Sequence, residues 1–313
     1  MMNRQALNQF SNSLHLSKEL LEKDAVIHLL LARISSSTYL RSNLVFKGGT
    51  CLVKAYIPYY RFSEDIDFSW RDQTGWERAS AKATEKSCLE ETKRIVEEMK
   101  NISNEIGLQF NPSIIEKEDI FISNSGTRLT IHLNYISAIT AQKDRIKMEV
   151  NFLEYYIFPF EEKNLESILS KLGTDAAFLF PEINKYRQPV ALTCYSVKEI
   201  FVEKVRAALT RIQYKIRDTI DMAMIQRTFN LDLYGYEEDA FKKIEFTAKR
   251  FSRYSDNLHG SPLPESAGQL EKEMILLIVQ RPKDLMPRMI DINRHLNQLK
   301  GEFLGRMERS ETV

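Results

Sequence analysis

The stretch that decides the fold begins with Val45-Phe46-Lys47-Gly48-Gly49-Thr50 and resumes, after a short predicted helix, as Arg61-Phe62-Ser63-Glu64-Asp65-Ile66-Asp67-Phe68. Residues 44–46 predict a short buried strand, and Thr50 is expected to cap a helix that Pro58 ends. A second strand is expected from Asp65 to Trp70. The order is therefore a strand, a glycine turn, a helix, and a strand that carries two aspartates.

The two aspartates of the second strand, Asp65 and Asp67, are predicted to hold a metal ion. Alternate side chains of a strand point to the same face, with Cα atoms about 6.5 to 7 Å apart. Two carboxylates so placed repel each other unless a cation lies between them. Mg²⁺ takes one or two protein carboxylates together with substrate phosphates and water, and Mn²⁺ is the alternative ion. Glu149, on the polar face of another strand, is the candidate third ligand, which matches metal-assisted nucleotidyl transfer.

The glycine turn before the helix is predicted to bind phosphates. Gly48 and Gly49 let the backbone approach a phosphate closely, and the N–H groups at a helix start are unpaired donors. The hydroxyl of Thr50 or Ser63 could bond the same phosphates. The role of Lys47 stays open, because a lysine at a strand end beside a tight turn is often solvated.

The rest of the chain predicts an α+β fold. Residues 128–136 and 145–153 alternate apolar and polar side chains, which indicates a sheet with one buried and one polar face. Ser196 begins a Ser-x-x-Glu capping box, and no good alternating segment follows it. Helical spacing is found in several segments, and 159–188 reads as irregular: the helical segments are 17–34, 77–104, 201–220, 237–255, 269–280 and 287–307. We expect a sheet domain over 1–195 and a helical domain over 196–313, although the first helix after Ser196 can equally pack on the sheet.

The composition excludes several classes of protein. The 313 residues carry 44 Lys and Arg against 43 Asp and Glu, a formal net charge of +1. With 43% hydrophobic residues, 11 Gly and 9 Pro, the chain is neither collagen-like nor disordered. Its longest nearly apolar run, 25–32, is far shorter than the roughly 20 residues of a membrane span, and residues 1–10 lack a signal-peptide pattern. Three scattered cysteines imply no disulfide framework, so we expect a cytoplasmic protein without a membrane partner.

The strand, Gly-Gly turn, helix and Asp-x-Asp strand, in this order, resemble the signature of the DNA polymerase β-type nucleotidyltransferases. The flanking segments 22–24, 45–52 and 61–68 are similar to the AbiEii/AbiGii toxin family, which includes the MenT toxins. A second block, Glu203-Lys204-x-Arg206-Ala207 with Arg211 and Arg217-Asp218-x-x-Asp221, resembles that family's Glu-Lys-x-x-Ala and Arg-Asp-x-x-Asp motifs. The resemblance implies a mixed-sheet polymerase β-type nucleotidyltransferase core with helices, followed by a C-terminal helical domain.

The resemblance also implies roles for individual residues. Asp65 and Asp67 match the family's metal-binding aspartates. Glu149 is the third metal ligand implied, although its strand is recognised by alternation and not by a motif. Catalysis falls to the same aspartate pair, to Lys204, and to Asp218 or Asp221. Nucleotide binding falls to Gly48, Gly49, Thr50, Ser63, Lys204 and Arg211.

A geometric test qualifies the second block. On one continuous helix Lys204, Arg211 and Asp218 fall within about 40° of one line. At 1.5 Å per residue, however, Lys204 and Asp218 would be roughly 21 Å apart along the axis. Either the helix breaks between them, or Asp218 orients another group, such as Arg211 or the acceptor. A solvated face with charges at this spacing is the plainer alternative.

The favoured hypothesis is a Mg²⁺-dependent nucleotidyltransferase that moves a nucleoside monophosphate from an NTP to an acceptor hydroxyl. The resemblance suggests a toxin of a type IV-like toxin–antitoxin or phage-defence system, with the tRNA 3′ end as acceptor and a cognate antitoxin as partner. A second hypothesis keeps the site and changes the acceptor to a small molecule or a protein side chain. A third is a non-catalytic binding module on the same fold.

Overall fold

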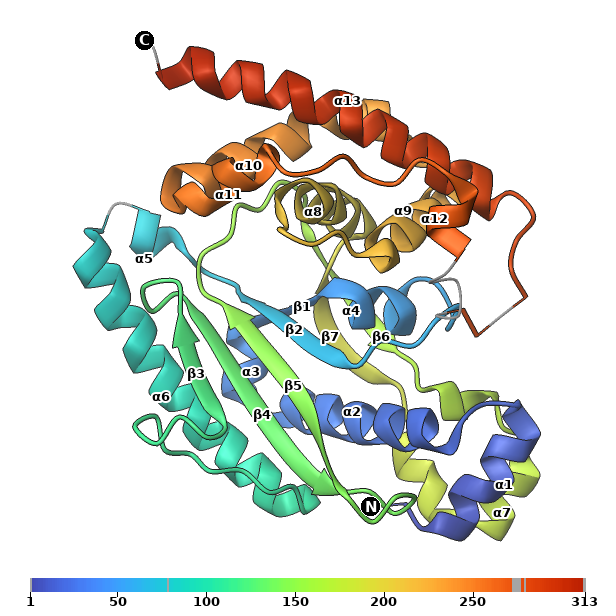
Figure 1. Ribbon diagram of the computed structural model, residues 1–313. Helices are drawn as coiled ribbons and strands as arrows, with labels where there is room; N and C mark the ends of the chain where they lie inside the picture. Colours follow the sequence, from blue (N-terminus) through green and yellow to red (C-terminus); the bar gives the residue numbers. More distant parts are fainter. Residues whose placement is uncertain (1, 78, 272–276, 279, 312–313) are drawn as a thin grey trace. The chain divides into compact units, whose positions relative to one another are not determined.

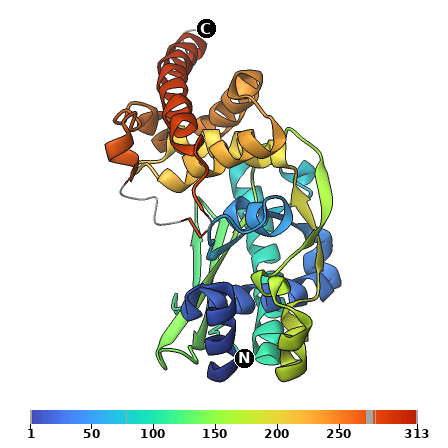
Figure 2. The same cartoon turned by 90° about the vertical axis from the view of Figure 1, so that its right-hand side faces the viewer.

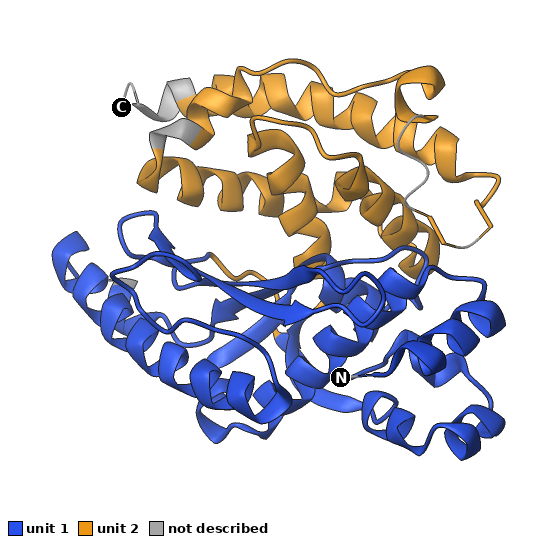
Figure 3. Cartoon of the chain, turned by 60° about the horizontal axis from the view of Figure 1, so that its bottom comes forward, with its two compact units in different colours: residues 1–154, 160–195 blue, residues 155–159, 196–313 orange. Residues whose placement is uncertain are grey.

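The computed structural model describes residues 2–77, 79–271, 277–278 and 280–311. The chain divides into two compact units, coloured separately in Figure 3. Unit 1 consists of residues 1–154 and 160–195, and unit 2 consists of residues 155–159 and 196–313. The short segment Tyr155–Pro159 therefore belongs to the later unit, although it lies between two parts of the earlier one in sequence.

Unit 1 is built on a mixed sheet with the strand order β3-β4-β5-β2-β1-β7-β6 (Figure 1). Neighbours β1 and β2 are antiparallel, as are β4 and β5, whereas β2 and β5 are parallel, as are β1 and β7. The strands are β1 (Leu44–Lys47), β2 (Asp65–Trp70), β3 (Ile120–Ser123), β4 (Arg128–Ile136), β5 (Lys143–Asn151), β6 (Phe160–Leu165) and β7 (Val190–Tyr195). The α+β prediction is confirmed.

The helices of unit 1 give its sheet one covered face. In Figure 1, α2, α3 and α6 lie behind β4, β5 and β2. The alternating apolar side chains of β4 and β5 are fully buried there: Leu129, Ile131, Leu133, Ile146, Met148 and Val150. The helical elements of unit 1 are α1 (Arg4–Leu14), α2 (Lys18–Ser36), α3 (Thr38–Asn43), α4 (Gly48–Ala55), α5 (Thr74–Glu77), α6 (Ala81–Ile106), η1 (Ile168–Lys171), α7 (Thr174–Leu179) and η2 (Pro181–Tyr186).

A buried ion pair fixes α4, the helix that follows the glycine turn, against α2. Lys54 Nζ lies 2.7 Å from Asp24 Oδ1, and both side chains are almost fully buried. The hydroxyls of Tyr59 and Ser167 and the main-chain N–H of Ile168 also donate to the Asp24 carboxylate. Because every one of these donors is satisfied by one acid, the network can hold α4 in a single position.

The N-terminal helix α1 packs against a later part of the same unit. Both views show α1 at the same end of unit 1 as the yellow-green segment that contains α7 (Figure 1, Figure 2). Phe10 of α1 meets Phe180, which follows α7, edge to face with ring centres 5.4 Å apart. Such edge-to-face pairs are favourable because the positive ring edge meets the negative ring face.

Unit 2 is helical. It contains α8 (Val197–Thr210), α9 (Ile216–Phe229), η3 (Leu233–Tyr236), α10 (Glu237–Arg250), α11 (Ser252–Leu258), α12 (Ala267–Glu271) and α13 (Leu285–Glu311). The capping box at its start is half formed. Ser196 Oγ accepts from the Glu199 N–H at 3.3 Å, but the Glu199 carboxylate accepts from the N–H groups of Ile157 and Phe158 and pairs with Lys243.

The structure corrects several expectations about elements. The segment 159–188, expected to be irregular, contains β6, η1, α7 and η2, and the strands β3 and β7 were not expected at all. The long helix expected over 201–220 is broken into α8 and α9. Of the helix expected over 269–280, α12 covers the start, and residues 272–276 and 279 lie outside the described residues. None of the described helices is both long and apolar enough to cross a membrane.

Candidate functional site

The predicted metal carboxylates lie on one face of two neighbouring strands. The parallel register of β2 and β5 sets Asp65 opposite Lys147 and Asp67 opposite Glu149. Successive side chains of a strand alternate between faces, so Asp65, Asp67, Lys147 and Glu149 share a face. This is the polar face of the sheet, since the intervening residues are the buried apolar ones.

The cations on this face form ion pairs with two of its three carboxylates. Lys147 Nζ lies 3.2 Å from Asp65 Oδ2 and 3.4 Å from Glu149 Oε1, and Arg128 Nη2 lies 2.6 Å from Glu149 Oε2. Burial alone would raise the pKa of Glu149, but Arg128 and Lys147 outweigh it and lower the pKa. The Asp67 carboxylate, by contrast, makes no hydrogen bond or ion pair with any residue that the structure describes. Burial, followed by the nearby Glu149 charge, raises the pKa of Asp67 to about 6.

The Gly48-Gly49 turn lies directly against Asp67. Gly48 has φ +77°, in the left-handed region that favours glycine, and a Cβ at this position would collide with the Asp67 carboxylate. A Cβ at Gly49 would crowd the guanidinium of Arg61 and come within 3.1 Å of Ser63 Oγ. Helix α4 begins at Gly48, and its N-cap residue Lys47 provides no side-chain cap. The first-turn amides therefore lack the usual side-chain acceptor and can bind an anion.

Thr50 does not cap the helix, because α4 already begins at Gly48. The Thr50 hydroxyl instead lies 2.9 Å from Ser63 Oγ and in contact with the main-chain oxygen of Asp65. Thr50 is fully buried, whereas Ser63 is half-buried beside Gly49. The Thr50 hydroxyl thus ties the glycine turn to the start of β2, and Ser63 is the better placed of the two to meet a phosphate.

Lys47, which ends β1, is buried and not solvated. Its ammonium forms an ion pair with Glu154, whose carboxylate also accepts from the hydroxyls of Ser69 and Tyr195 and, at 2.9 Å, from the amide of Asn151. This satisfied cluster continues the polar face beyond Asp67, because Lys47 lies opposite Asp67 in the β1–β2 register. The Lys47 charge also partly opposes the rise in the Asp67 pKa.

The Asp65–Asp67 pair fits Mg²⁺. Its donors are carboxylate oxygens, and the Asp67 carboxylate has no hydrogen-bond or ion-pair partner among the described residues. Within the described ranges, no three His, Cys, Asp or Glu side chains are gathered into a metal-binding group, and Arg128 and Lys147 occupy Glu149. Mg²⁺ needs only one or two protein carboxylates. Asp65 and Asp67 would therefore hold the ion, and Glu149 as third ligand stays a prediction.

In unit 2 the structure brings Lys204, Asp218 and Asp221 together. The break between α8 and α9 turns the chain, so that Lys204 Nζ lies 2.8 Å from Asp218 Oδ1 and 2.7 Å from Asp221 Oδ2. Arg211, at the C-cap of α8, pairs with the other Asp218 oxygen. Both alternatives thus hold: the helix breaks, and Asp218 orients Arg211. Two buried acids balance two cations, and the nucleotide-binding and catalytic roles of this cluster stay predictions.

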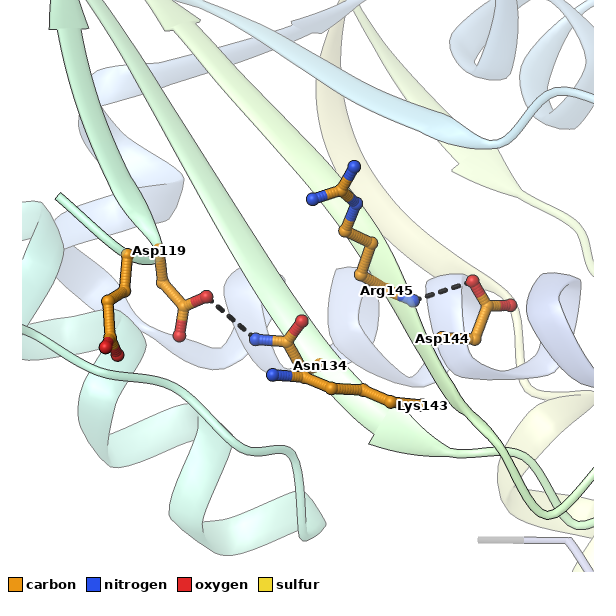
Figure 4. A pocket seen from close by; sticks show the side chains of 6 residues that line it. Asp119, Asn134, Lys143, Asp144 and Arg145 are labelled. Atoms are coloured by element: carbon orange, nitrogen blue, oxygen red, sulfur yellow. Dashed lines mark hydrogen bonds between the residues drawn. The ribbon is translucent and has the colours of Figure 1, made fainter.

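Unit 1 also carries a hollow that the sequence did not indicate. It has a volume of about 590 Å³ and lies further along β4 and β5 than the carboxylates (Figure 4). In Figure 4 Asn134 and Asp119 point toward each other, joined by a 2.8 Å hydrogen bond, and Arg145 extends away from the Asp144 carboxylate. The other lining residues are Glu118 and Lys143.

Two cations at the site, Lys147 and Arg128, were missed by the sequence interpretation. Both cations form ion pairs with Glu149, and neither forms one with Asp67. They therefore determine that Asp67 is the carboxylate without an ion-pair partner within the ranges that the structure describes. The alternation of 145–153 already places Lys147 on the same face as Glu149, so this signal was present. Arg128 could not be found in that way, because its place opposite Asn151 depends on the antiparallel register of β4 and β5.

The chain is similar to one protein family and to two solved structures. A family model described as "Nucleotidyl transferase AbiEii toxin, Type IV TA system" matches residues 29–303. Two solved structures are similar over 95% and 94% of this chain and 98% of theirs: JHP933 from Helicobacter pylori (15% identity, TM-score 0.46) and a candidate nucleotidyltransferase from H. pylori (13%, TM-score 0.44). A comparison with curated proteins gives no match. Since the family model spans most of the sequence, the chain belongs to the AbiEii nucleotidyl transferase toxin family, a type IV toxin–antitoxin family, and is a nucleotidyltransferase.

Proposed function

We propose that the protein is a Mg²⁺-dependent toxin that transfers a nucleoside monophosphate from an NTP to the 3′-terminal hydroxyl of a tRNA. It would act in the cytoplasm, in a toxin–antitoxin or phage-defence pair whose antitoxin restrains it. The single observation that carries this proposal is the unpaired Asp67 carboxylate facing the uncapped Gly48-Gly49 turn. An uncapped helix start favours a polyphosphate, and an adjacent unpaired acid favours the cation that accompanies it.

The residues of unit 1 divide the work as follows. The amides at the start of α4 and the Ser63 hydroxyl bind triphosphate oxygens, and the absence of side chains at Gly48 and Gly49 lets the phosphates approach. Asp65 and Asp67 hold Mg²⁺, which when bound neutralises phosphate charge and lowers the barrier to attack. The acceptor oxygen forms a bond to the α-phosphorus as the bond to the pyrophosphate oxygen breaks. A carboxylate of the face takes the proton that the acceptor loses.

Incubation of the whole protein with each α-³²P-labelled NTP, Mg²⁺ and either total RNA or protein tests the proposal. We expect label on RNA, migrating with tRNA, and no label with Asp65→Asn. Label confined to a small molecule or to protein would contradict the tRNA acceptor and support the second hypothesis. No label from the wild type under any condition would contradict the Mg²⁺-dependent transfer itself.

The cluster in unit 2 needs its own measurement. If Lys204 binds nucleotide phosphates, Lys204→Met should weaken NTP binding, measured by equilibrium dialysis, more than Asp221→Asn does. Equal NTP binding by wild type and Lys204→Met would show that the cluster only stabilises the junction of α8 and α9.

A further inference from the structure

The outer part of the polar sheet face carries two aromatic rings in contact. Phe121 on the edge strand β3 lies opposite Thr130, which is two residues before His132 and shares its face of β4. The Phe121 and His132 ring centres are 5.1 Å apart, and Phe121 keeps 40% of its surface exposed. A large exposed aromatic on a sheet face is a surface on which a flat ring can stack.

The neighbouring strand β5 adds positive charge to the same face. Lys143, Arg145 and Lys147 occupy alternate positions and therefore point to one side, about 6.8 Å apart along the strand. Lys143 and Arg145 form no ion pair with any residue in the described part of the chain. Both line the 590 Å³ hollow, and Figure 4 shows the Arg145 guanidinium held clear of the Asp144 carboxylate. We call Phe121, His132, Lys143 and Arg145 the aromatic–basic face.

The aromatic–basic face continues directly from the carboxylates. Lys147, which pairs with Asp65, lies opposite His132 in the β4–β5 register. From β2 across β5 and β4 to β3 there are three strand spacings, about 14 Å in all. A strand of nucleic acid that ended at Asp65 could therefore reach Phe121 within a few nucleotides.

We propose that the aromatic–basic face binds the single-stranded 3′ end of the acceptor RNA. One base stacks on the exposed Phe121 ring, which His132 contacts at an angle of 55° between the ring planes, and backbone phosphates contact Arg145 and Lys143. The combination of an exposed aromatic pair with unpaired cations matches single-stranded nucleic acid, whose bases are open to stacking, and not a duplex, whose bases are enclosed. This inference rests on the proposed nucleotidyl transfer and names the surface that presents the acceptor to it.

The test measures binding of a short RNA with a free 3′ hydroxyl and a 5′ fluorescein label to the full chain, by anisotropy, without NTP. We expect Phe121→Ala to weaken binding about tenfold with an unchanged salt dependence, since stacking carries no charge. Arg145→Gln should reduce the slope of log K against log salt by about 0.7. Phe178→Ala, an exposed aromatic of α7, and Arg41→Gln, an exposed cation of α3, are the matched controls.

Several outcomes would overturn the inference. They are RNA binding within twofold of wild type for both face variants, tighter binding of duplex than of single-stranded RNA, tighter binding of single-stranded DNA, or equal losses in the controls. Thermal unfolding of each variant separates lost contacts from lost folding. RNA binding that depends on Phe121, together with no transfer to any acceptor, would refute the proposed function alone. Transfer to RNA with an acceptor KM unaffected by Phe121→Ala and Arg145→Gln would refute this inference alone.

Discussion

Two acids in unit 1, Asp24 and Asp67, show how the same side chain can serve opposite purposes. Asp24 is 3% exposed and accepts from Lys54, Tyr59, Ser167 and a main-chain N–H. Asp67 has no such partner among the described residues, and burial with the Glu149 charge raises its pKa to about 6. A satisfied buried charge fixes structure, whereas an unsatisfied one is available to a ligand. The difference therefore assigns Asp24 to the scaffold and supports our proposal that Asp67 binds the metal ion.

The largest expected effect comes from removing the unsatisfied acid. Asp67→Asn should lower nucleotide transfer at least a thousandfold, about 4 kcal/mol of transition-state free energy, because it removes a ligand of the metal. It should not lower the melting temperature of the metal-free protein, since it also removes an unpaired carboxylate. Thermal unfolding with and without Mg²⁺ checks both points. Mg²⁺ should raise the melting temperature of the wild type and of an exposed control, Asp175→Asn. An equal rise in Asp67→Asn would show that Asp67 does not bind the metal ion.

Removing the ion-pair partner of Asp24 should instead lower the stability of the protein. Lys54→Met leaves Asp24 charged and buried without its ion-pair partner, so the free energy of unfolding should fall by about 4 kcal/mol. Urea unfolding measures this loss. The double variant Asp24→Asn/Lys54→Met should recover part of it, because no uncompensated charge remains. A loss in Lys54→Met below about 1 kcal/mol would mean that the pair contributes little to the scaffold.

The scaffold network also contains a group that acid can disturb. His28 is fully buried beside Lys54 and Asp24; burial, and then the Lys54 charge, lower its pKa to about 4, while the Gln188 carbonyl and Asp24 oppose the shift. Between about pH 6.5 and 4 the unfolded chain binds a proton at His28 that the folded chain does not. Stability should therefore fall by about 2 to 3 kcal/mol as the pH falls through this range. Urea unfolding should show a smaller fall for His28→Gln, while exposed His15→Gln should behave as wild type.

The smallest expected effect comes from adding a methyl group at the glycine turn that faces Asp67. Gly48→Ala and Gly107→Ala both place a Cβ on a left-handed backbone, at φ +77° and +75°. Gly107→Ala should cost about 1 kcal/mol of stability, and Gly48→Ala should cost more because its Cβ also collides with the Asp67 carboxylate. Only at Gly48 does the Cβ meet a carboxylate, since nothing lies within 4 Å at Gly107. NTP affinity should therefore fall severalfold in Gly48→Ala alone, by calorimetric titration. Equal NTP affinity in the two variants would argue against the turn as the phosphate site.

The sequence predicted the parts of unit 1 whose side chains alternate. The period-two pattern of β4 and β5 follows from one buried and one polar face, and it placed Glu149 on the polar face. That Glu149 lies opposite Asp67 is known only from the β2–β5 register. β7 was missed because Val190–Tyr195 is buried at all but one position and so does not alternate. β6 was missed because Phe160–Leu165 is an edge strand rich in charge, which carries little strand signal.

The site itself was predictable in its residue types but not in its pairings. Asp65, Asp67 and the glycine turn were found from spacing, because strand geometry alone sets their direction. The break between Lys204 and Asp218 was only one of the alternatives left open, since residues 211–215 contain neither Gly nor Pro, and helical spacing continues across them. Cations from other strands, such as Arg128, determine which acid is paired. The sequence around each acid does not show which cation will reach it.

The segment Tyr155–Pro159 gives the chain an unusual order of assembly. This segment precedes β6 and β7 in the chain, yet its backbone is held by Glu199, some 40 residues further on, and by Lys243, 88 residues after Tyr155. The sequence of the sheet unit is therefore interrupted by a segment whose main-chain partners lie in the helical unit. Truncation after residue 195 would remove Glu199 and leave the N–H groups of Ile157 and Phe158 without their acceptor. A different helical unit could therefore replace the present one only if segment Tyr155–Pro159 were replaced with it.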